Sequence, residues 1–189
     1  MINYSFDSEE EKIFYQWLLE LYNKQIVKRI EPDRISFSIF DKVEYDSFKK
    51  SGKKYVSVKK ALIQEKIYTP DFIFELDNNY ATQLGLERKE KPLLPLIISS
   101  DGMCYVDVKG AFTRNLTSSI TFPDRQAMMY SKHSIYINKV IPYSKKKCLF
   151  KETFYPKSFI SDQIYKVGDK KGTSKLTGDV KTIDSFLKI

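Results

Sequence analysis

Two short hydrophobic segments, each carrying one aspartate, constrain the fold of this chain more than any other feature. Residues 70–75 (Pro-Asp-Phe-Ile-Phe-Glu) and 103–110 (Met-Cys-Tyr-Val-Asp-Val-Lys-Gly) are rich in aromatic and β-branched side chains, which is typical of strands. Pro70 suits the first position of a strand, because a missing amide donor is tolerated there. The chain is therefore expected to build a sheet in which two strands each carry an acid.

The remaining periodicity predicts a compact α/β domain with a mixed sheet. Apolar residues recur at helical spacing from residue 8 to about residue 24, behind an acidic first turn. Further elements are predicted from alternation, prolines and turn residues: a strand at 35–40 paired with 43–48, a strand at 55–58, an insertion loop at 77–95, a helix at 123–132 and a strand at 134–143.

The length of 189 residues favours one domain with a real core over two ordinary domains. We expect this domain to span residues 1–165. Residues 166–189 are rich in glycine, lysine, serine and threonine and are expected to form a flexible basic tail.

Lysine and arginine exceed the acids and give a formal net charge of +8, which favours a polyanionic partner such as nucleic acid. The excess is concentrated in residues 48–66, which hold seven lysines and one acid. A charge run of this kind is equally typical of a solvated face. We expect the aromatic residues of the alternating segments to lie in the core rather than to stack on bases.

Several classes of protein are disfavoured by the sequence. Cys104 and Cys148 cannot build a disulfide framework and lack zinc-site spacing. The N-terminus has no apolar segment of signal-peptide length, and no stretch approaches the length of a membrane span. His133 is the only histidine and has no partner for a hydrolase triad. We expect a protein of the cytoplasm without a membrane partner.

Asp71, Asp107 and Lys109 have the chemistry that phosphodiester hydrolysis requires. Carboxylates hold a divalent cation at the phosphate, and a lysine stabilises the charge that develops there. Neighbouring strands can bring the two acids to one ion, and the two-residue period of a strand places Asp107 and Lys109 on one face. Magnesium is the expected ion, with manganese as a substitute.

Pro70-Asp71 and Asp107-Val108-Lys109 resemble the signature of the PD-(D/E)xK nuclease superfamily, which includes restriction enzymes, junction resolvases and RecB-type nucleases. The resemblance covers roughly residues 6–142. It implies a restriction-endonuclease-like core, a central mixed β-sheet flanked by helices. It also implies that both aspartates and the Val108 carbonyl bind the metal while Lys109 assists the attacking water.

Two further motifs extend the resemblance. Residues 6–11 (Phe-Asp-Ser-Glu-Glu-Glu) are similar to the Ser-x-x-Glu helix start of phage-associated nucleases and of transposase endonuclease subunits, which would make Glu11 a third acid of the metal site. A capping box gives the same pattern, and Glu10 is the alternative because it is in phase with the apolar helix face. Gln126 and Tyr130 resemble the Gln-xxx-Tyr helix of RecB-type nucleases, although an ordinary surface and core pair gives the same spacing.

The leading hypothesis is a magnesium-dependent DNA endonuclease from a bacterial or phage-infected cell, selective for junctions or branches or directed by a partner. Junction cleavage would favour a homodimer. The alternatives are a non-catalytic nucleic-acid-binding or assembly protein and a nuclease that cuts RNA. Expected contacts to the DNA backbone are Lys49, Lys50, Lys53, Lys54, Lys59, Lys60, Arg114, Arg125, Tyr130 and Lys132.

The end of the chain resembles a peptide that docks on a sliding clamp. Ile183 is followed at three and four positions by the bulky apolar residues Phe186 and Leu187. The usual leading glutamine is absent, and a hydrophobic terminus that packs on its own domain explains the pattern equally well.

Overall fold

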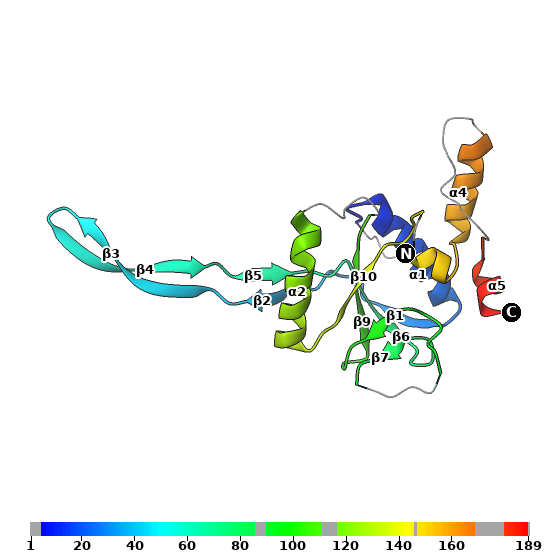
Figure 1. Ribbon diagram of the computed structural model, residues 1–189, viewed down its shortest axis with the longest axis horizontal. Helices are drawn as coiled ribbons and strands as arrows, with labels where there is room; N and C mark the ends of the chain where they lie inside the picture. Colours follow the sequence, from blue (N-terminus) through cyan, green and yellow to red (C-terminus); the bar gives the residue numbers. More distant parts are fainter. Residues whose placement is uncertain (1–4, 86–89, 111–116, 146, 169–179, 189) are drawn as a thin grey trace.

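A four-stranded mixed sheet forms the centre of the protein (Figure 1). The computed structural model describes residues 5–85, 90–110, 117–145, 147–168 and 180–188. The strand order is β1 (Val27–Ile30), β6 (Phe72–Leu76), β9 (Met103–Val108) and β10 (Ile137–Val140). The first three strands are antiparallel neighbours, and β10 runs parallel to β9. A parallel neighbour needs a crossover, and helix α2 (Thr117–His133) lies in this connection.

Helix α1 (Glu9–Asn23) covers one face of the sheet. The Ser8 side chain accepts the backbone N–H of Glu11 at 3.1 Å, which satisfies one of the free amides of the first turn. The apolar stripe of the helix, with Phe14 and Trp17 fully buried, packs on side chains of β6 and β9. The predicted helix from residue 8 to about residue 24 is therefore confirmed.

Helix α2 covers the opposite face with a smaller core. Met129 is fully buried in a cluster that contains Ile73 of β6, Tyr105 of β9 and Ile137 of β10. The helix begins before its expected start and includes Pro123. The chain thus has a mixed sheet flanked by helices, as the sequence predicted.

A long two-stranded ribbon extends from this body (Figure 1). Its outer part, which we call the arm, consists of β3 (Val43–Ser51) and β4 (Lys54–Ile63). Its inner part, which we call the stem, consists of β2 (Phe37–Phe40) and β5 (Lys66–Tyr68). Gly52 adopts a φ of 64° in the two-residue turn of the arm, a conformation for which glycine is favoured.

The ribbon corrects one predicted pairing. The strand at residues 35–40 was expected to pair with residues 43–48, but β2 pairs with β5 and β3 pairs with β4. The chain continues outward through β2 and β3 and returns through β4 and β5, so β3 and β4 form a hairpin around the two-residue turn and β2 pairs with the more distant β5. The strand expected at 55–58 is present within the longer β4.

The C-terminal third adds short helices to the α1 side of the sheet. These are α3 (Leu149–Glu152), α4 (Lys157–Gly168) and α5 (Ile183–Leu187). In the described parts of the excursion, residues 77–85 and 90–95, the one regular element is β7 (Thr82–Gln83), which pairs with β8 (Ile97–Ile98). No helix among the described residues is long and apolar enough to cross a membrane.

Candidate functional site

The structure brings Asp71, Asp107 and Lys109 together at one end of the central strands. The Asp71 backbone N–H donates to the Val106 carbonyl at 2.9 Å, and its Oδ2 accepts the Val108 N–H at 2.7 Å. Lys109 Nζ lies 2.7 Å from Asp107 Oδ2. The predicted acid on β9, the lysine just after β9 and the acid before β6 therefore share one neighbourhood.

Asp107 is a buried carboxylate, with 4% of the residue exposed. Its Oδ1 accepts a hydrogen bond of 2.9 Å from the Tyr68 hydroxyl. Its Oδ2 is buried and makes no hydrogen bond, since the contact with Lys109 is an ion pair without hydrogen-bond geometry. A buried charged oxygen without a hydrogen bond is costly unless a cation compensates it.

The surroundings of Asp71 also disfavour a charged carboxylate. Burial, and next the neighbouring charge of Asp107, raise the pKa of Asp71 to about 7, against smaller opposing effects of the Val108 amide and Lys109. Two carboxylates that share a site disfavour each other's charged form. Burial and the same Asp107 charge also raise the pKa of the Tyr68 hydroxyl, so Tyr68 remains a hydrogen-bond donor to Asp107.

This donor set fits a hard divalent cation. The fit rests on two buried carboxylates in one neighbourhood, since burial and the charge of Asp107 raise the pKa of Asp71, while Asp107 Oδ2 is engaged by the Lys109 ion pair alone. No three histidine, cysteine or acidic side chains gather into a metal site within the described part of the chain. Magnesium commonly takes one or two protein carboxylates and completes its shell with water and phosphate oxygens.

The helix acid of the site was expected to be Glu11, but the structure commits this side chain to other contacts. Glu11 accepts from Ser8 Oγ at 3.2 Å and from Arg34 Nη2 at 2.9 Å, so it closes a capping box and an ion pair. Glu10 lies instead against the residue after Lys109, since a Cβ on Gly110 would be 3.0 Å from Glu10 Oε1. The charge of Glu11 nevertheless raises the pKa of Asp71, so both helix acids lie close to the site.

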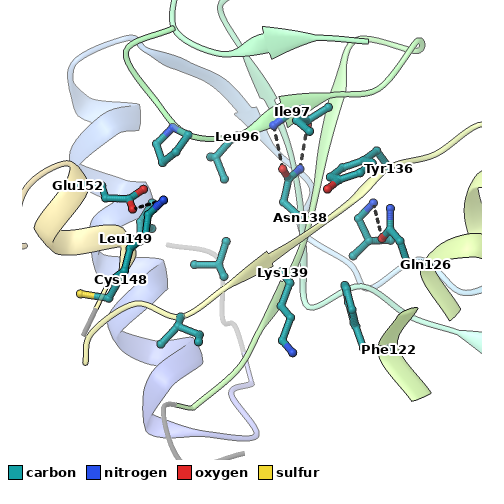
Figure 2. Close-up of a pocket in the computed structure, with 15 residues that line it drawn as sticks. Leu96, Ile97, Phe122, Gln126, Tyr136, Asn138, Lys139, Cys148, Leu149 and Glu152 are labelled. Atoms are coloured by element: carbon teal, nitrogen blue, oxygen red, sulfur yellow. Dashed lines mark hydrogen bonds and ion pairs between the residues drawn. The ribbon is translucent and has the colours of Figure 1, made fainter. Parts of the chain in front are cut away.

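Gln126 faces β10 and not the two aspartates. Its Oε1 accepts the backbone N–H of Ile137 at 3.1 Å, and the side chain lines a cavity of about 350 Å³ beside β10 (Figure 2). None of the residues lining that cavity is Asp71, Asp107 or Lys109. Tyr130 is half exposed. Gln126 and Tyr130 therefore do not lie together at the two aspartates.

The residues predicted to contact the DNA backbone lie in different parts of the structure. The lysines of the arm are exposed, and Lys59 forms an ion pair with Asp46. Arg125 lines a cavity of about 370 Å³ between the stem and α2 and acts electrostatically on Tyr68. Lys132 forms an exposed ion pair of 2.7 Å with Asp41, which links α2 to the segment after β2. Arg114 lies outside the described residues.

The C-terminal segment packs on its own domain. Ile183 is 2% exposed within the main core, and Phe186 and Leu187 pack against that core. Residues 180–188 therefore do not form the free tail that was expected. Burial of these apolar side chains in the domain is favourable. Ile183 is thus not accessible to a clamp.

Sequence reasoning missed two residues of the site. Tyr68 is one of thirteen tyrosines and carries no local signal, because its contact with Asp107 depends on how the stem returns to the sheet. Arg34 was also missed, since its ion pair with Glu11 joins the helix start to the segment before β2.

Comparison with protein-family models, with curated proteins and with solved structures gives no match to this chain.

Proposed function

We propose that the chain is a metal-dependent DNA endonuclease with a PD-(D/E)xK core. The observation that carries the proposal is the buried pair of aspartates, in which Asp107 has an oxygen without a hydrogen bond at 2.7 Å from Lys109. The central mixed sheet flanked by helices supports it, because this is the architecture that the motif resemblance implies. Magnesium would be held by Asp71, Asp107 and the Val108 carbonyl.

Each side chain has a defined part in this proposal. Bound magnesium neutralises phosphate charge and lowers the pKa of a coordinated water. Lys109 carries a positive charge beside Asp107 and stabilises the charge that develops on the phosphate. Tyr68 orients Asp107 through its hydroxyl and acts as a positioning residue. Glu10 replaces Glu11 as the proposed helix acid because of its contact with Gly110.

The test is a cleavage assay on branched DNA, duplex DNA, single-stranded DNA and RNA, with magnesium or with EDTA. The proposal expects DNA cleavage that requires magnesium and is lost in Lys109→Ala. Lys28→Ala is a matched control at an exposed lysine of β1. A Lys109→Ala protein that cuts as fast as the parent would refute the assignment.

A non-catalytic nucleic-acid-binding protein with this fold is the second candidate. The observation that favours it is the ion pair between Glu11 and Arg34, which engages an acid expected at the metal site. The same assay separates the two candidates, because this protein would bind the DNA substrates and leave all of them intact.

A further inference from the structure

The arm exposes large apolar side chains that no described part of the body covers. Phe48 is 69% exposed and Tyr55 is 71% exposed. Along both strands of the arm, only Ser47 and Val58 are partly buried. The aromatic residues of this segment were expected in the core, and the structure corrects that expectation.

The two aromatic residues lie on the same face near the turn. Lys50 is paired with Tyr55, and Phe48 is paired with Ser57. Directly opposed residues of an antiparallel pair share a face, and the diagonal neighbours on that face are within reach of large side chains. Phe48 and Tyr55 therefore form one exposed aromatic surface at the outer end of the arm.

This aromatic surface is surrounded by positive charge. Residues 47–60 contain six lysines and no acid: Lys49, Lys50, Lys53, Lys54, Lys59 and Lys60. Lysines on free strand edges discourage pairing with other chains, which explains the charge but not the exposed Phe48 and Tyr55. Positive charge interleaved with exposed aromatic rings is the surface that binds single-stranded nucleic acid.

The stem, which carries the arm, is held against the candidate site and α2. Tyr68 at the end of the stem donates to Asp107. Helix α2 holds the other stem strand, since His133 Nε2 lies 2.9 Å from the Ser38 carbonyl and Lys132 binds Asp41. With about 3.3 Å per residue, strands of this length reach about 30 Å, which is close to one turn of duplex DNA.

We propose that the arm binds DNA containing unpaired bases and presents it to the candidate site. The lysines contact the phosphates, and Phe48 and Tyr55 stack on bases that have left the duplex. Paired bases are already stacked on their neighbours, so the aromatic surface favours a fork, a junction or a single strand over continuous duplex. The inference rests on the proposed nuclease function and assigns its substrate class.

The test measures equilibrium binding of the full chain to fluorescein-labelled fork, single-stranded and duplex DNA in EDTA. The double variant Phe48→Ala/Tyr55→Ala keeps every lysine of the arm. It should weaken binding to the fork and the single strand by roughly tenfold or more, and binding to duplex by less than about threefold. Tyr22→Ala, an exposed tyrosine at the end of α1, should bind all three as the parent does.

A second variant tests the role of charge. Changing Lys49, Lys50, Lys53 and Lys54 to glutamine should weaken binding to all three DNAs. The slope of log affinity against log salt should fall by about 3, since each lysine that neutralises a phosphate contributes about 0.7 to 0.9. An unchanged slope would show that these lysines do not contact the phosphates and would overturn their part of the proposal.

Two results would overturn the stacking proposal. The first is a double variant that binds fork and duplex with the parent's ratio of affinities. The second is a change of oligomeric state, measured by size-exclusion chromatography with light scattering: a dimeric parent and a monomeric double variant whose DNA binding is unchanged. The arm would then bind a second copy of the chain. Because EDTA prevents cleavage, fork-selective binding by a protein that cuts nothing in magnesium would refute the nuclease function and leave the arm's role intact.

Discussion

Replacing Asp71 with asparagine should stabilise the metal-free protein at alkaline pH while abolishing cleavage. Burial and the charge of Asp107 raise the pKa of Asp71 from 3.8 to about 7, so ionisation of Asp71 destabilises the folded state. At 1.36 kcal/mol per pKa unit, the full effect is about 4 kcal/mol. Asparagine retains an oxygen for the Val108 amide, which binds Asp71 Oδ2 in the parent, and carries no charge.

The effect has a defined pH window. Below about pH 4, Asp71 is protonated in both the folded and the unfolded chain, and its contribution to stability is fully present. As the pH rises from about 4 to about 7, the unfolded chain releases the proton and the folded chain keeps it, so stability is lost. About 2.5 kcal/mol of that loss falls between about pH 5 and about pH 8.

Urea unfolding in EDTA at these two pH values measures the effect. The stability advantage of Asp71→Asn over the parent should grow by about 2.5 kcal/mol between the lower and the higher pH. Asp162→Asn, an exposed position on α4, is the control for removal of one charge. Saturating magnesium should abolish the advantage, because a ligand that binds the folded parent stabilises it. Parallel pH profiles of the parent and Asp71→Asn would refute the reasoning.

Three further outcomes are expected. Glu10→Gln should lower the cleavage rate more than Glu11→Gln, and the reverse order of cleavage rates would restore Glu11 as the helix acid. Glu11→Gln should lower the free energy of unfolding by about 1 kcal/mol, because the ion pair with Arg34 loses its negative charge, while glutamine keeps the capping box. Tyr68→Phe should lower the free energy of unfolding by about 1 to 3 kcal/mol, because Asp107 Oδ1 loses its hydrogen bond, and should raise the magnesium concentration that half-saturates cleavage. An unchanged magnesium requirement would show that Tyr68 only supports the fold. Ile183→Ala should lower the free energy of unfolding by about 2 to 4 kcal/mol, whereas a docking tail free in solution would show no loss.

The site could be predicted from local rules where the geometry is local. Asp107 and Lys109 share a face because side chains on a strand alternate, and Pro70 marks the strand entry at Asp71. The sequence could not decide in the same way between Glu10 and Glu11 as the helix acid. Neighbouring positions on a helix differ by about 100° around its axis, and only the packing against Gly110 and Arg34 distinguishes them.

The exposure of the arm could not be predicted from local sequence, because it depends on whether a distant part of the chain covers these strands. Alternation in residues 43–48 indicated a strand but not its partner. Phe48 and Tyr55 were assigned to the core because large aromatic side chains are usually buried, and only the absence of a covering layer over the described arm reverses this. Gly52 was the available signal for a hairpin, because it lies in a short turn between two runs that combine lysines with aromatic and β-branched residues.

The central claim is that Asp71 and Asp107 act together as a magnesium site beside Lys109. Its most direct test is the single-turnover cleavage rate of forked DNA in magnesium for the parent and for Asp107→Asn, with both proteins shown to be folded by circular dichroism. Cleavage by the parent is expected, with a rate at least about a hundredfold lower for the variant. Equal rates for the two proteins would contradict it.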